Sequence, residues 1–470
     1  MKKTSVVSIL PALILAGFTS NASGAGFAIA EQSVKGLGTA FSGGAASADD
    51  ASTVWYNPAG MTQFSGTHVS QAIHGIFPKA KFNNSGSTTH PAFGGAPLSG
   101  KNFDSGKDAI VPNFYITHSL NERMVVGLGM NAPFGLVTDH DKDWVGRYHA
   151  LRSDVATVNI NPSIAFKITD KFSIGYGVSV QYIDVKLSNA VDMSGTCLGL
   201  ASAGVVPAAN CAATGLTSPG SLATDSEARV EGDDWSWGFN IGVMFEPMEG
   251  TRLGAHYRSK IGHEVTGAAE FFHTHPGASA FAGGLALAGS PLLSNQEITA
   301  ALDLPESISV SAYHEFNPKW SVQGDVTWMK WKRFDELRID FVGNRPDAVT
   351  PEEWESTYRY ALGTTYKMNN KMSFRGGVAF DETPIPNKEL RTPRIADEDR
   401  IWVAIGGSYS LSDSTSIDVG YTHIFVKDPE IDYSAGPHAN PEPGSLPESR
   451  LIGEYDASVD IISVQLNMEF

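Results

Sequence analysis

The amino-acid sequence predicts an all-β protein, a transmembrane antiparallel β-barrel of about 14 strands that holds an N-terminal plug in its lumen. Three observations lead to this prediction. Apolar residues alternate with small or polar ones over much of the chain. Short and long connections between these stretches follow one another strictly. Residues 25–66, here called the hatch segment, are rich in Gly, Ala and Ser and keep no apolar period for long, so they cannot build a core alone.

Residues 1–24 have the features of an export signal. Two lysines follow the initiator Met, residues 5–18 form a short apolar core, and small residues at 21–24 suit cleavage before Ala25. The apolar core is too short and too early for a spanning helix, and no later apolar run has the length that a bilayer requires. We therefore expect an exported protein that crosses a membrane with strands.

The hatch segment is not linker-like, because large apolar residues are scattered among its small ones. These residues are Phe27, Ile29, Phe41, Trp55, Tyr56 and Met61. Small residues let backbones approach closely, and a few aromatic side chains can hold the segment in place. We expect residues 25–66 to form a compact plug within a barrel that residues 67–470 build.

The strand pattern is clearest at residues 172–182, where every even position is apolar and every odd position is small or polar. A period of two over this length gives a strand with one apolar face and one polar face. Similar alternation occurs at 308–316, 320–328, 372–380, 401–411, 417–421 and 462–470. A soluble β-sandwich alternates in the same way, so the connections have to distinguish the two folds.

The connections favour an outer-membrane barrel. Six are tight, at 119–122, 169–171, 247–250, 317–319, 369–371 and 411–414. Seven are long, at roughly 79–109, 133–151, 188–224, 273–295, 338–354, 384–399 and 429–455. Their strict alternation gives an even number of strands with all long loops at one rim, as in barrels with periplasmic turns and extracellular loops. The terminal Phe470 suits such a barrel, and Trp320, Trp328, Trp331 and Trp402 are expected at the membrane interfaces.

The composition of the 470-residue chain limits the possible functions. A net charge of −17 argues against nucleic acid, whose binders need a positive surface. The hydrophobic fraction of 42% would suit a soluble protein, but an average hides residues that alternate between lipid and water. The two cysteines, Cys197 and Cys211, lie in one Gly/Ala-rich segment, and after export we expect them to form a disulfide that closes a loop. A metal site would need more ligands nearby, so neither a metal nor a cofactor is expected.

Short motifs follow one another along the mature chain. The hatch segment contains Ala-Gly-Phe at 25–27, Gly-Leu-Gly with Gly36 and Gly38, Ser-Gly at 42–43, Ala-Asp-Asp-Ala at 48–51 and the triplet Asn57, Pro58, Ala59. Downstream are Pro-Phe-Gly-Leu at 133–136, Asp399 and Arg400 with Trp402, and Asp-Val-Gly at 418–420. In these motifs and their spacing the chain resembles the outer-membrane long-chain fatty-acid transporters, a family that includes importers of aromatic hydrocarbons. The resemblance implies a fourteen-stranded barrel with a hatch, and a ligand that is captured at outer loops, passed to an inner pocket and released sideways through a gap in the wall.

Two long loops are unexpectedly apolar for segments that face water, at residues 196–207 and 280–293. Exposed apolar surface commonly marks a binding site, and burying an alkyl chain at roughly 25 cal/mol per Å² would give several kcal/mol. Candidate contacts are Leu200, Phe281, Leu285 and Leu287, together with Phe27 inside the barrel. The alternative is that the two loops pack on each other as a lid, and both descriptions can hold at once.

A fatty acid carries a carboxylate, so its inner pocket should offer a cation. Alternation in the strand near 251–261 places Arg252, Arg258 and Lys260 towards the lumen, and the same rule places Arg375 there. Near strand ends, Arg338 and Lys186 are weaker candidates. The alternative for each of these side chains is a lumenal salt bridge with an acidic neighbour.

One stretch of the predicted wall should break its pairing. Gly129, Pro133, Phe134 and Gly135 stand where a strand ends, and Pro lacks the N–H that the ladder needs while Gly weakens a strand. In the terms of the family, such a break could serve lateral exit. The alternative is that these residues only begin the second outer loop.

We therefore expect passive transport of long-chain fatty acids or similar hydrophobic molecules across the outer membrane, by a monomer surrounded by lipid and lipopolysaccharide. The acidic run at 139–143 and the histidines at 273 and 275 are expected to be solvated, or to bridge lipopolysaccharide through divalent ions. No Gly-x-Ser-x-Gly, His-Glu-x-x-His or phosphate-binding glycine loop is present, so no enzyme is expected. The alternatives are an importer of aromatic hydrocarbons, an outer-membrane enzyme that acts on lipids, and an open porin.

Overall fold

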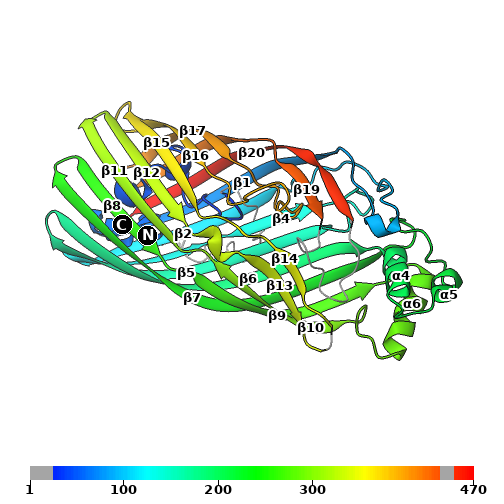
Figure 1. The fold of residues 1–470 in the computed structure, drawn as a ribbon. Coiled ribbons are helices and arrows are strands. Elements are labelled where there is room, and N and C mark those ends of the chain that lie inside the picture. Colours follow the sequence, from blue (N-terminus) through cyan, green and yellow to red (C-terminus); the bar gives the residue numbers. More distant parts are fainter. Residues whose placement is uncertain (1–24, 344, 435–448) are drawn as a thin grey trace, which may run out of the picture.

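The computed structural model describes residues 25–343, 345–434 and 449–470; the predicted leader, residues 1–24, lies outside the described residues. The strands close into one antiparallel barrel, because β1 pairs with β2 on one side and with β20 on the other (Figure 1). When each interrupted span is counted once, the strands of the described residues make 14 spans. The predicted fold class is therefore confirmed.

The strands are β1 Thr67–Asn84, β2 Ala109–Asn121, β3 Met124–Asn131, β4 Gly135–Asp139, β5 Arg152–Thr169, β6 Phe172–Val191, β7 Ser226–Met248, β8 Thr251–Arg258, β9 Ile261–Phe272, β10 Gln296–Leu304, β11 Ser307–Asn317, β12 Trp320–Met329, β13 Glu336–Phe341, β14 Ala348–Pro351, β15 Thr357–Lys367, β16 Met372–Asp381, β17 Arg400–Ser412, β18 Thr415–Val426, β19 Glu430–Ser434 and β20 Arg450–Glu469. The helices are α1 Val34–Leu37, α2 Gly44–Ser47, α3 Thr53–Tyr56, α4 Met193–Ser202, α5 Ala208–Ala213 and α6 Pro276–Leu287, with 3₁₀ turns η2 Pro58–Gln63, η3 Pro91–Phe93 and η4 Trp331–Arg333.

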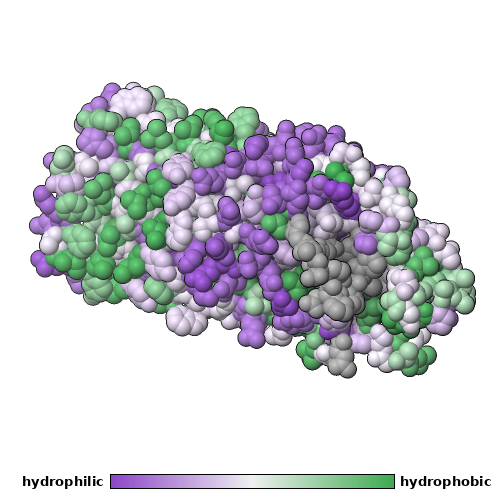
Figure 2. Space-filling model, in the orientation of Figure 1, coloured by the Kyte–Doolittle hydropathy of each residue, from purple (hydrophilic) through white to green (hydrophobic). Residues whose placement is uncertain are grey.

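The two faces of the wall follow the alternation of the sequence. On β6, Tyr176 and Val180 are 45% and 39% exposed, whereas Ser179 and Gln181 between and beside them are buried. Figure 2 shows that hydrophobic residues gather on the part of the barrel farthest from α4–α6, and that a hydrophilic zone separates this part from the outer helices. The apolar zone is where lipid covers the wall, and the longer strands carry the loops beyond it. None of the helices in the described residues is long and apolar enough to cross a membrane.

The hatch segment fills the lumen at the end of the barrel that holds the C-terminus (Figure 1). Its short elements α1, α2, α3 and η2 touch strands all around the wall, including β5–β8, β11, β17, β18 and β20. Leu37, Val54, Ala59 and Met61 are fully buried by these contacts. Four short helical turns form here instead of regular structure because small residues dominate the segment and the wall, not an internal core, supplies its packing.

Glycines of the wall allow the hatch backbone to approach closely. A Cβ atom on Gly254 would lie 1.8 Å from the Ala45 carbonyl oxygen, and one on Gly377 would lie 2.1 Å from the Thr39 carbonyl carbon. Real Cβ atoms do not approach that closely, so any side chain at these positions would displace the hatch segment. Glycine weakens a strand, but at these inward positions it leaves the room that the backbone of the hatch segment occupies.

Two of the tryptophans expected at the membrane interface lie inside the barrel instead. Trp331 and Trp402 are 1% and 0% exposed, whereas Trp320 is 45% exposed on the outer face. Trp402 occupies an inward position of β17 and packs against Phe41, with ring centroids 6.1 Å apart. Trp331 starts the turn η4, which leaves the strand direction, so its sequence position near a strand end does not place it at the interface.

Gly377→Val should expel the hatch segment from its seat, whereas Gly376→Val should not. The neighbouring residue Gly376 faces outward, and its Cβ would meet nothing nearer than an atom at 4.0 Å. Overpacking at Gly377 should lower the free energy of unfolding by about 1–3 kcal/mol and raise ion conductance in planar bilayers. Equal conductance and urea midpoints for the two variants would contradict the close seat described here.

Candidate ligand path

Five aromatic rings pack closely inside the barrel around Phe27, the third residue of the hatch segment, and this cluster is here called the aromatic pocket. The ring centroid of Phe27 lies 4.9 Å from that of Trp331, 5.7 Å from that of Phe334 and 5.9 Å from that of Trp354. Phe134 completes the cluster at 6.0 Å, and all five rings are at least 90% buried. The rings come from distant parts of the chain, so only the closed barrel brings them together.

The backbone before Phe27 is fixed by two buried carboxylates. The Ala25 N–H donates to Asp381 at 3.1 Å, and the Gly26 N–H donates to Asp397 at 2.8 Å. Asp397 also forms an ion pair with Arg400. Gly26 has φ +66°, and a Cβ there would lie 2.7 Å from the Trp354 ring, so the pocket requires glycine at this position. These contacts place Phe27 in the pocket.

A polar rim borders the aromatic pocket on the side of the outer loops. Here Arg394 precedes Ile395, which packs in the same hydrophobic cluster as Phe27 and Trp354. The Arg394 guanidinium donates to the Ser153 hydroxyl and the Arg152 carbonyl oxygen, both at 3.1 Å. Among the described residues no carboxylate lies within 4.0 Å of it. Burial lowers the pKa of Arg394 to about 10, so it remains a cation at neutral pH.

Glu352 lies at the same rim and is 3% exposed. It accepts a hydrogen bond of 3.0 Å from the indole N–H of Trp354. Burial raises the pKa of Glu352 to about 8, against the opposing effects of that hydrogen bond and of Arg394. At neutral pH the rim therefore offers a guanidinium cation and a neutral carboxylic acid, a combination that suits an anion with oxygen atoms.

Two buried histidines of the outer loops lie near enough to Arg394 for its charge to act on them. Burial, together with the charge of Arg394, lowers the pKa of His140 and of His149 to about 4, so both are neutral at physiological pH. One ring nitrogen of each, Nε2 of His140 and Nδ1 of His149, has no hydrogen-bond partner among the described residues, and the same holds for the Thr392 hydroxyl. Buried polar atoms without partners indicate room for water or a polar ligand group.

The barrel wall is interrupted beside this pocket. β3 pairs with β5 as far as Asn131, and β4 resumes the pairing at Gly135. The three residues between β3 and β4 lie opposite only two residues of β5. Residues 109–113 of β2, which precede Phe114, pair only with β1 among the described strands, so a gap lies between them and β4. The gap closes again where Gly106 forms a bridge with Thr138. Thus Gly129 lies within β3, while Pro133 and Phe134 lie in the interruption.

The hatch segment lies across this interruption. The Ile29 N–H donates to the Pro133 carbonyl oxygen, and the Gly135 N–H donates to the Phe27 carbonyl oxygen, both at 2.9 Å. Together they form an antiparallel bridge between Ala28 and Phe134. The segment therefore supplies the backbone partner that the wall lacks here.

Three arginines expected to face the lumen do so, but each already has a partner. The Arg258 guanidinium stacks on Trp55 at 3.5 Å and donates to its carbonyl oxygen at 2.9 Å, so it holds α3. Arg375 donates to Ser408 at 2.5 Å and lies 3.7 Å from Asp418. Arg252 lies over the ring of Tyr313 at 4.3 Å. None of the three belongs to the cluster around Phe27.

Two other expected cations form partly exposed ion pairs. Lys260 forms an ion pair with Asp303 at 2.8 Å and its side chain is 46% exposed. Lys260 shares the parity of Arg258, but the alternation of β8 stops at Arg258 and restarts at Ile261 with opposite parity, so Lys260 lies on the outer side. Arg338 is 42% exposed and pairs with Glu336 and Asp347. Lys260 therefore does not face the lumen as expected, Arg338 has the acidic partners of the alternative interpretation, and Arg394, on a loop without periodicity, carried no signal.

The motif residues of the hatch segment connect it to the wall. Asn57 donates to the carbonyl oxygens of Ala45 at 2.6 Å and of Val243 at 3.0 Å, and its side-chain oxygen caps η2 by accepting from Ala59. Pro58 occupies the first turn of η2, where its missing N–H is not needed. Gly36 and Gly38 allow close contact with Ser33 and with Gly406 of β17.

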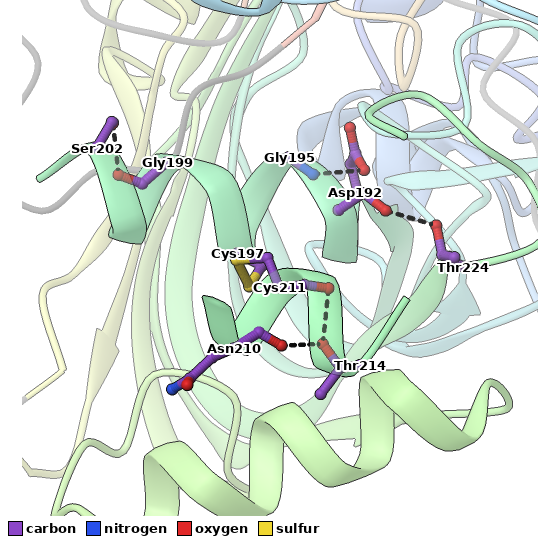
Figure 3. The surroundings of a disulfide bond; sticks show 10 residues. Asp192, Gly195, Cys197, Gly199, Ser202, Asn210, Cys211, Thr214 and Thr224 are labelled. Carbon is purple, nitrogen blue, oxygen red and sulfur yellow. Dashed lines mark hydrogen bonds between the residues drawn. A yellow bond between two sulfur atoms is a disulfide. The ribbon is translucent and has the colours of Figure 1, made fainter. Parts of the chain in front are cut away.

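The two apolar outer loops form a helical cap. Cys197 of α4 and Cys211 of α5 form a disulfide, and α6 packs beside them (Figure 3). Phe281 and Leu285 are 5% and 4% exposed because they form the shared core of this cap. Leu200 packs partly against that core, whereas Leu287 is 93% exposed. The two loops therefore pack on each other, and only part of their apolar surface faces outward.

A closed barrel with a lipid-facing wall, a plugged lumen and an aromatic inner pocket defines an outer-membrane transport protein. The chain belongs to the outer membrane protein transport protein family (OMPP1/FadL/TodX), whose model matches residues 15–470. The protein is accordingly located in the outer membrane.

Curated relatives match over most of their length. The chain is 30% identical over 413 residues to the putative outer membrane protein NMB0088 of Neisseria meningitidis, covering 86% of each chain. It is 29% identical over 426 residues to the long-chain fatty acid transport protein of Escherichia coli O6:H1, covering 90% of this chain and 92% of that protein.

Two solved structures share the fold. A crystal structure of a Pseudomonas aeruginosa FadL homologue has a TM-score of 0.83 at 26% identity, covering 95% of this chain and all of that one. The Pseudomonas putida toluene transporter TodX has a TM-score of 0.60 at 15% identity, covering 89% and 94% of the two chains, which shows the fold alone.

The pKa of Glu352 predicts a pH dependence of stability. The pKa of Glu352 is about 8 in the folded state against 4.5 for an ordinary glutamate, so the folded state holds the proton more tightly than the unfolded state does. With respect to this group the free energy of unfolding is therefore highest below pH 4.5, and it falls as the pH rises towards 8. The decline should be about 1.4 kcal/mol per pH unit within this window. Urea midpoints of the wild type and of Glu352→Gln should therefore diverge with pH, since the amide does not titrate. The exposed neighbour Glu355→Gln should follow the wild type; parallel curves for wild type and Glu352→Gln would refute the assignment.

Proposed function

We propose that this protein carries long-chain fatty acids passively across the outer membrane. The observation that carries the proposal is the aromatic pocket around Phe27 with the Arg394 guanidinium at its rim, free of any carboxylate within 4.0 Å among the described residues. An alkyl chain suits the rings and a carboxylate suits the cation and the neutral Glu352. The names of the curated relatives support a lipid ligand.

The route begins at the helical cap and ends at the interruption of the wall. The exposed apolar surface of α4–α6, including Leu287, captures the ligand from the outer leaflet or the medium. The ligand then moves to the pocket around Phe27 and leaves through the interruption between β2 and β4, so it never crosses the plugged end of the lumen. The concentration gradient and consumption inside the cell drive this flux.

An importer of aromatic hydrocarbons is the second candidate. It is favoured by one observation, the four aromatic rings whose centroids lie within 6.0 Å of that of Phe27. A hydrocarbon would need no cation at the rim, so Arg394 distinguishes the two ligands. A lipid-acting enzyme lacks support, since the relatives and structures described above are named for transport or as outer-membrane proteins. The hatch segment argues against an open porin.

Arg394→Met should weaken binding of oleate by at least about tenfold, because a charge-assisted hydrogen bond is lost while the apolar stem is kept. Binding of toluene to the same variant should be unchanged. Ligand binding to purified protein, followed by quenching of tryptophan fluorescence, measures both. The exposed Arg338→Met is the matched control and should bind oleate like the wild type. Unchanged oleate affinity in Arg394→Met would overturn the fatty-acid proposal and favour the hydrocarbon.

Replacing both cysteines by serine should impair capture without affecting the inner pocket. The disulfide closes a loop of 14 residues, for which the chain-entropy model gives about 3 kcal/mol. Without it α4 and α5 should separate, so that uptake of radiolabelled oleate at low concentration falls several-fold while saturating uptake and the melting of the barrel stay the same. Uptake equal to that of the wild type at every concentration would show that the cap has no part in capture.

A further inference from the structure

The interruption of the wall is covered by the first residues of the hatch segment, and one side chain there bonds to both of its edges. Gln32 is 1% exposed and lies between the end of β3 and the neighbouring strand β2. Its side-chain oxygen accepts from the Asn131 amide at 2.6 Å and from the Tyr115 hydroxyl at 3.2 Å. Asn131 ends β3, and Tyr115 belongs to β2. The side-chain carbonyl of Gln32 thus connects β2 and β3 next to the point where their pairing ends.

The amide nitrogen of the same side chain bonds to the interruption itself. It donates to the Ala132 carbonyl oxygen at 3.0 Å and to the Ile29 carbonyl oxygen at 2.9 Å. Ala132 is the first residue after β3 ends, and Ile29 is the hatch residue that pairs with Pro133. A glutamine side chain has two acceptor positions and two donor hydrogens, and all four are used here.

The neighbouring contacts depend on this side chain. The side-chain amide of Asn113 donates to the Glu31 carbonyl oxygen at 2.6 Å. Asn113 belongs to β2 and lies on the edge of the gap that faces β4. On the other edge, only two backbone hydrogen bonds join residues 27–29 to residues 133–135. Two such bonds are a weak closure by comparison with a continuous ladder, because each contributes about 0.5–1.5 kcal/mol. Gln32 is therefore placed to decide how long this closure lasts.

We infer that Gln32 is the latch of the lateral exit: its side chain holds residues 27–32 across the interruption, and its release opens the wall to a hydrophobic molecule that leaves the pocket. Gln32 acts through the backbone bridge and does not touch the ligand, so it is a positioning residue. This inference rests on the proposed function, in which the ligand leaves through the interruption.

The motion required is small. Breaking the bonds from Ile29 to Pro133 and from Gly135 to Phe27 frees residues 27–29 from the wall, while α1 to η2 keep their own contacts with glycines and with Asn57. Phe27 leaves the aromatic pocket in the same movement once the bonds of Ala25 to Asp381 and of Gly26 to Asp397 also break. Release of the latch therefore couples emptying of the pocket to opening of the wall.

Hydrogen exchange of the full-length protein in detergent tests the latch directly. Gln32→Met keeps the length of the side chain and removes all four hydrogen bonds. The Ile29 and Gly135 amides should then exchange at least tenfold faster, whereas amides in β16 and β17 should be unchanged. The matched control is Gln323→Met, because Gln323 is equally buried and bonds to the hatch residues Thr39 and Ser42 far from the interruption. It should leave the Ile29 and Gly135 amides at the wild-type rate.

Wild-type exchange at Ile29 and Gly135 in Gln32→Met would overturn the inference, as would equally faster exchange throughout the barrel, which would mark a general structural role. Should Gln32→Met not assemble, Gln32→Glu serves for the same comparison. It keeps the two acceptor contacts and loses the two donated bonds, so an intermediate rate is expected and a wild-type rate would overturn the inference.

A cross-link separates failure of the latch from failure of the exit route. Ala28 and Phe134 form a non-hydrogen-bonded antiparallel pair, whose Cα atoms are close enough for a disulfide. The double variant Ala28→Cys, Phe134→Cys should take up radiolabelled oleate several-fold more slowly when oxidised than when reduced; the two forms are compared within one variant because both lack the Phe134 ring of the pocket. Wild type treated with the same reductant controls for Cys197–Cys211. Uptake by Gln32→Met should be several-fold faster than by the wild type.

The outcomes point to different failures. Uptake that the cross-link leaves unchanged would contradict lateral exit, and with it the proposed function. Uptake that the cross-link blocks, combined with wild-type uptake and wild-type exchange in Gln32→Met, would leave the exit route intact and overturn the latch alone.

Discussion

The close seat of the hatch segment against the glycines of the wall is the contact on which the rest of this structure depends. A barrel of fourteen spans has a lumen too wide for its own side chains to fill, so something must occupy it or water will. Here the backbone of the hatch segment approaches Gly254 and Gly377 within distances that no side chain would permit. The plug is therefore held mainly by shape, and it reaches the pocket and the interruption from a fixed position.

Polar groups complete this seat because a plug in the lumen cannot leave its backbone unsatisfied. Asn57 connects α2, η2 and β7, and Gln465 of β20 accepts from the Val34 N–H at 2.9 Å and donates to Asp50 at 2.7 Å. Arg258 contributes a cation over Trp55. Such bonds are modest singly, but their loss would leave buried groups without partners, which is costly. Of the inward arginines of the wall, Arg258 thus holds the plug, whereas Arg375 and Arg252 contact other residues of the wall, and the cation available to a ligand comes from a loop.

Irregularities of the wall build the functional regions. The reversal of parity between β8 and β9 turns Ile261 inward and Lys260 outward, and the turn η4 directs Trp331 into the lumen. The interruption between β3 and β4 brings Phe134 to the same pocket and leaves an edge that the hatch segment covers. Regular strands would have given a smooth wall with a polar lumen and no aromatic pocket. Pocket and exit therefore arise at neighbouring departures from regular pairing.

The sequence by itself determined the barrel, the number of its spans and the side of each regular strand that faces lipid, because a period of two and the lengths of connections are local properties of the chain. It also contained the hydrophobic character of the outer loops and the residues that interrupt β3. It misplaced Trp331 and Lys260, since a turn or an unpaired residue reverses the parity that follows, and such a defect is not visible from composition. Trp402 was misplaced because it lies at an inward position of β17 although it stands near the end of that strand.

Only the tertiary structure decided which residues meet. Phe27 lies hundreds of positions from Trp331 and Trp354, and Arg394 and Glu352 stand on loops without periodicity. The side chain of Gln32 looked like one more polar residue of a small-residue segment until both edges of the wall closed around it. Contacts of this kind depend on closure of the barrel, which fixes distances between residues that the chain itself leaves far apart.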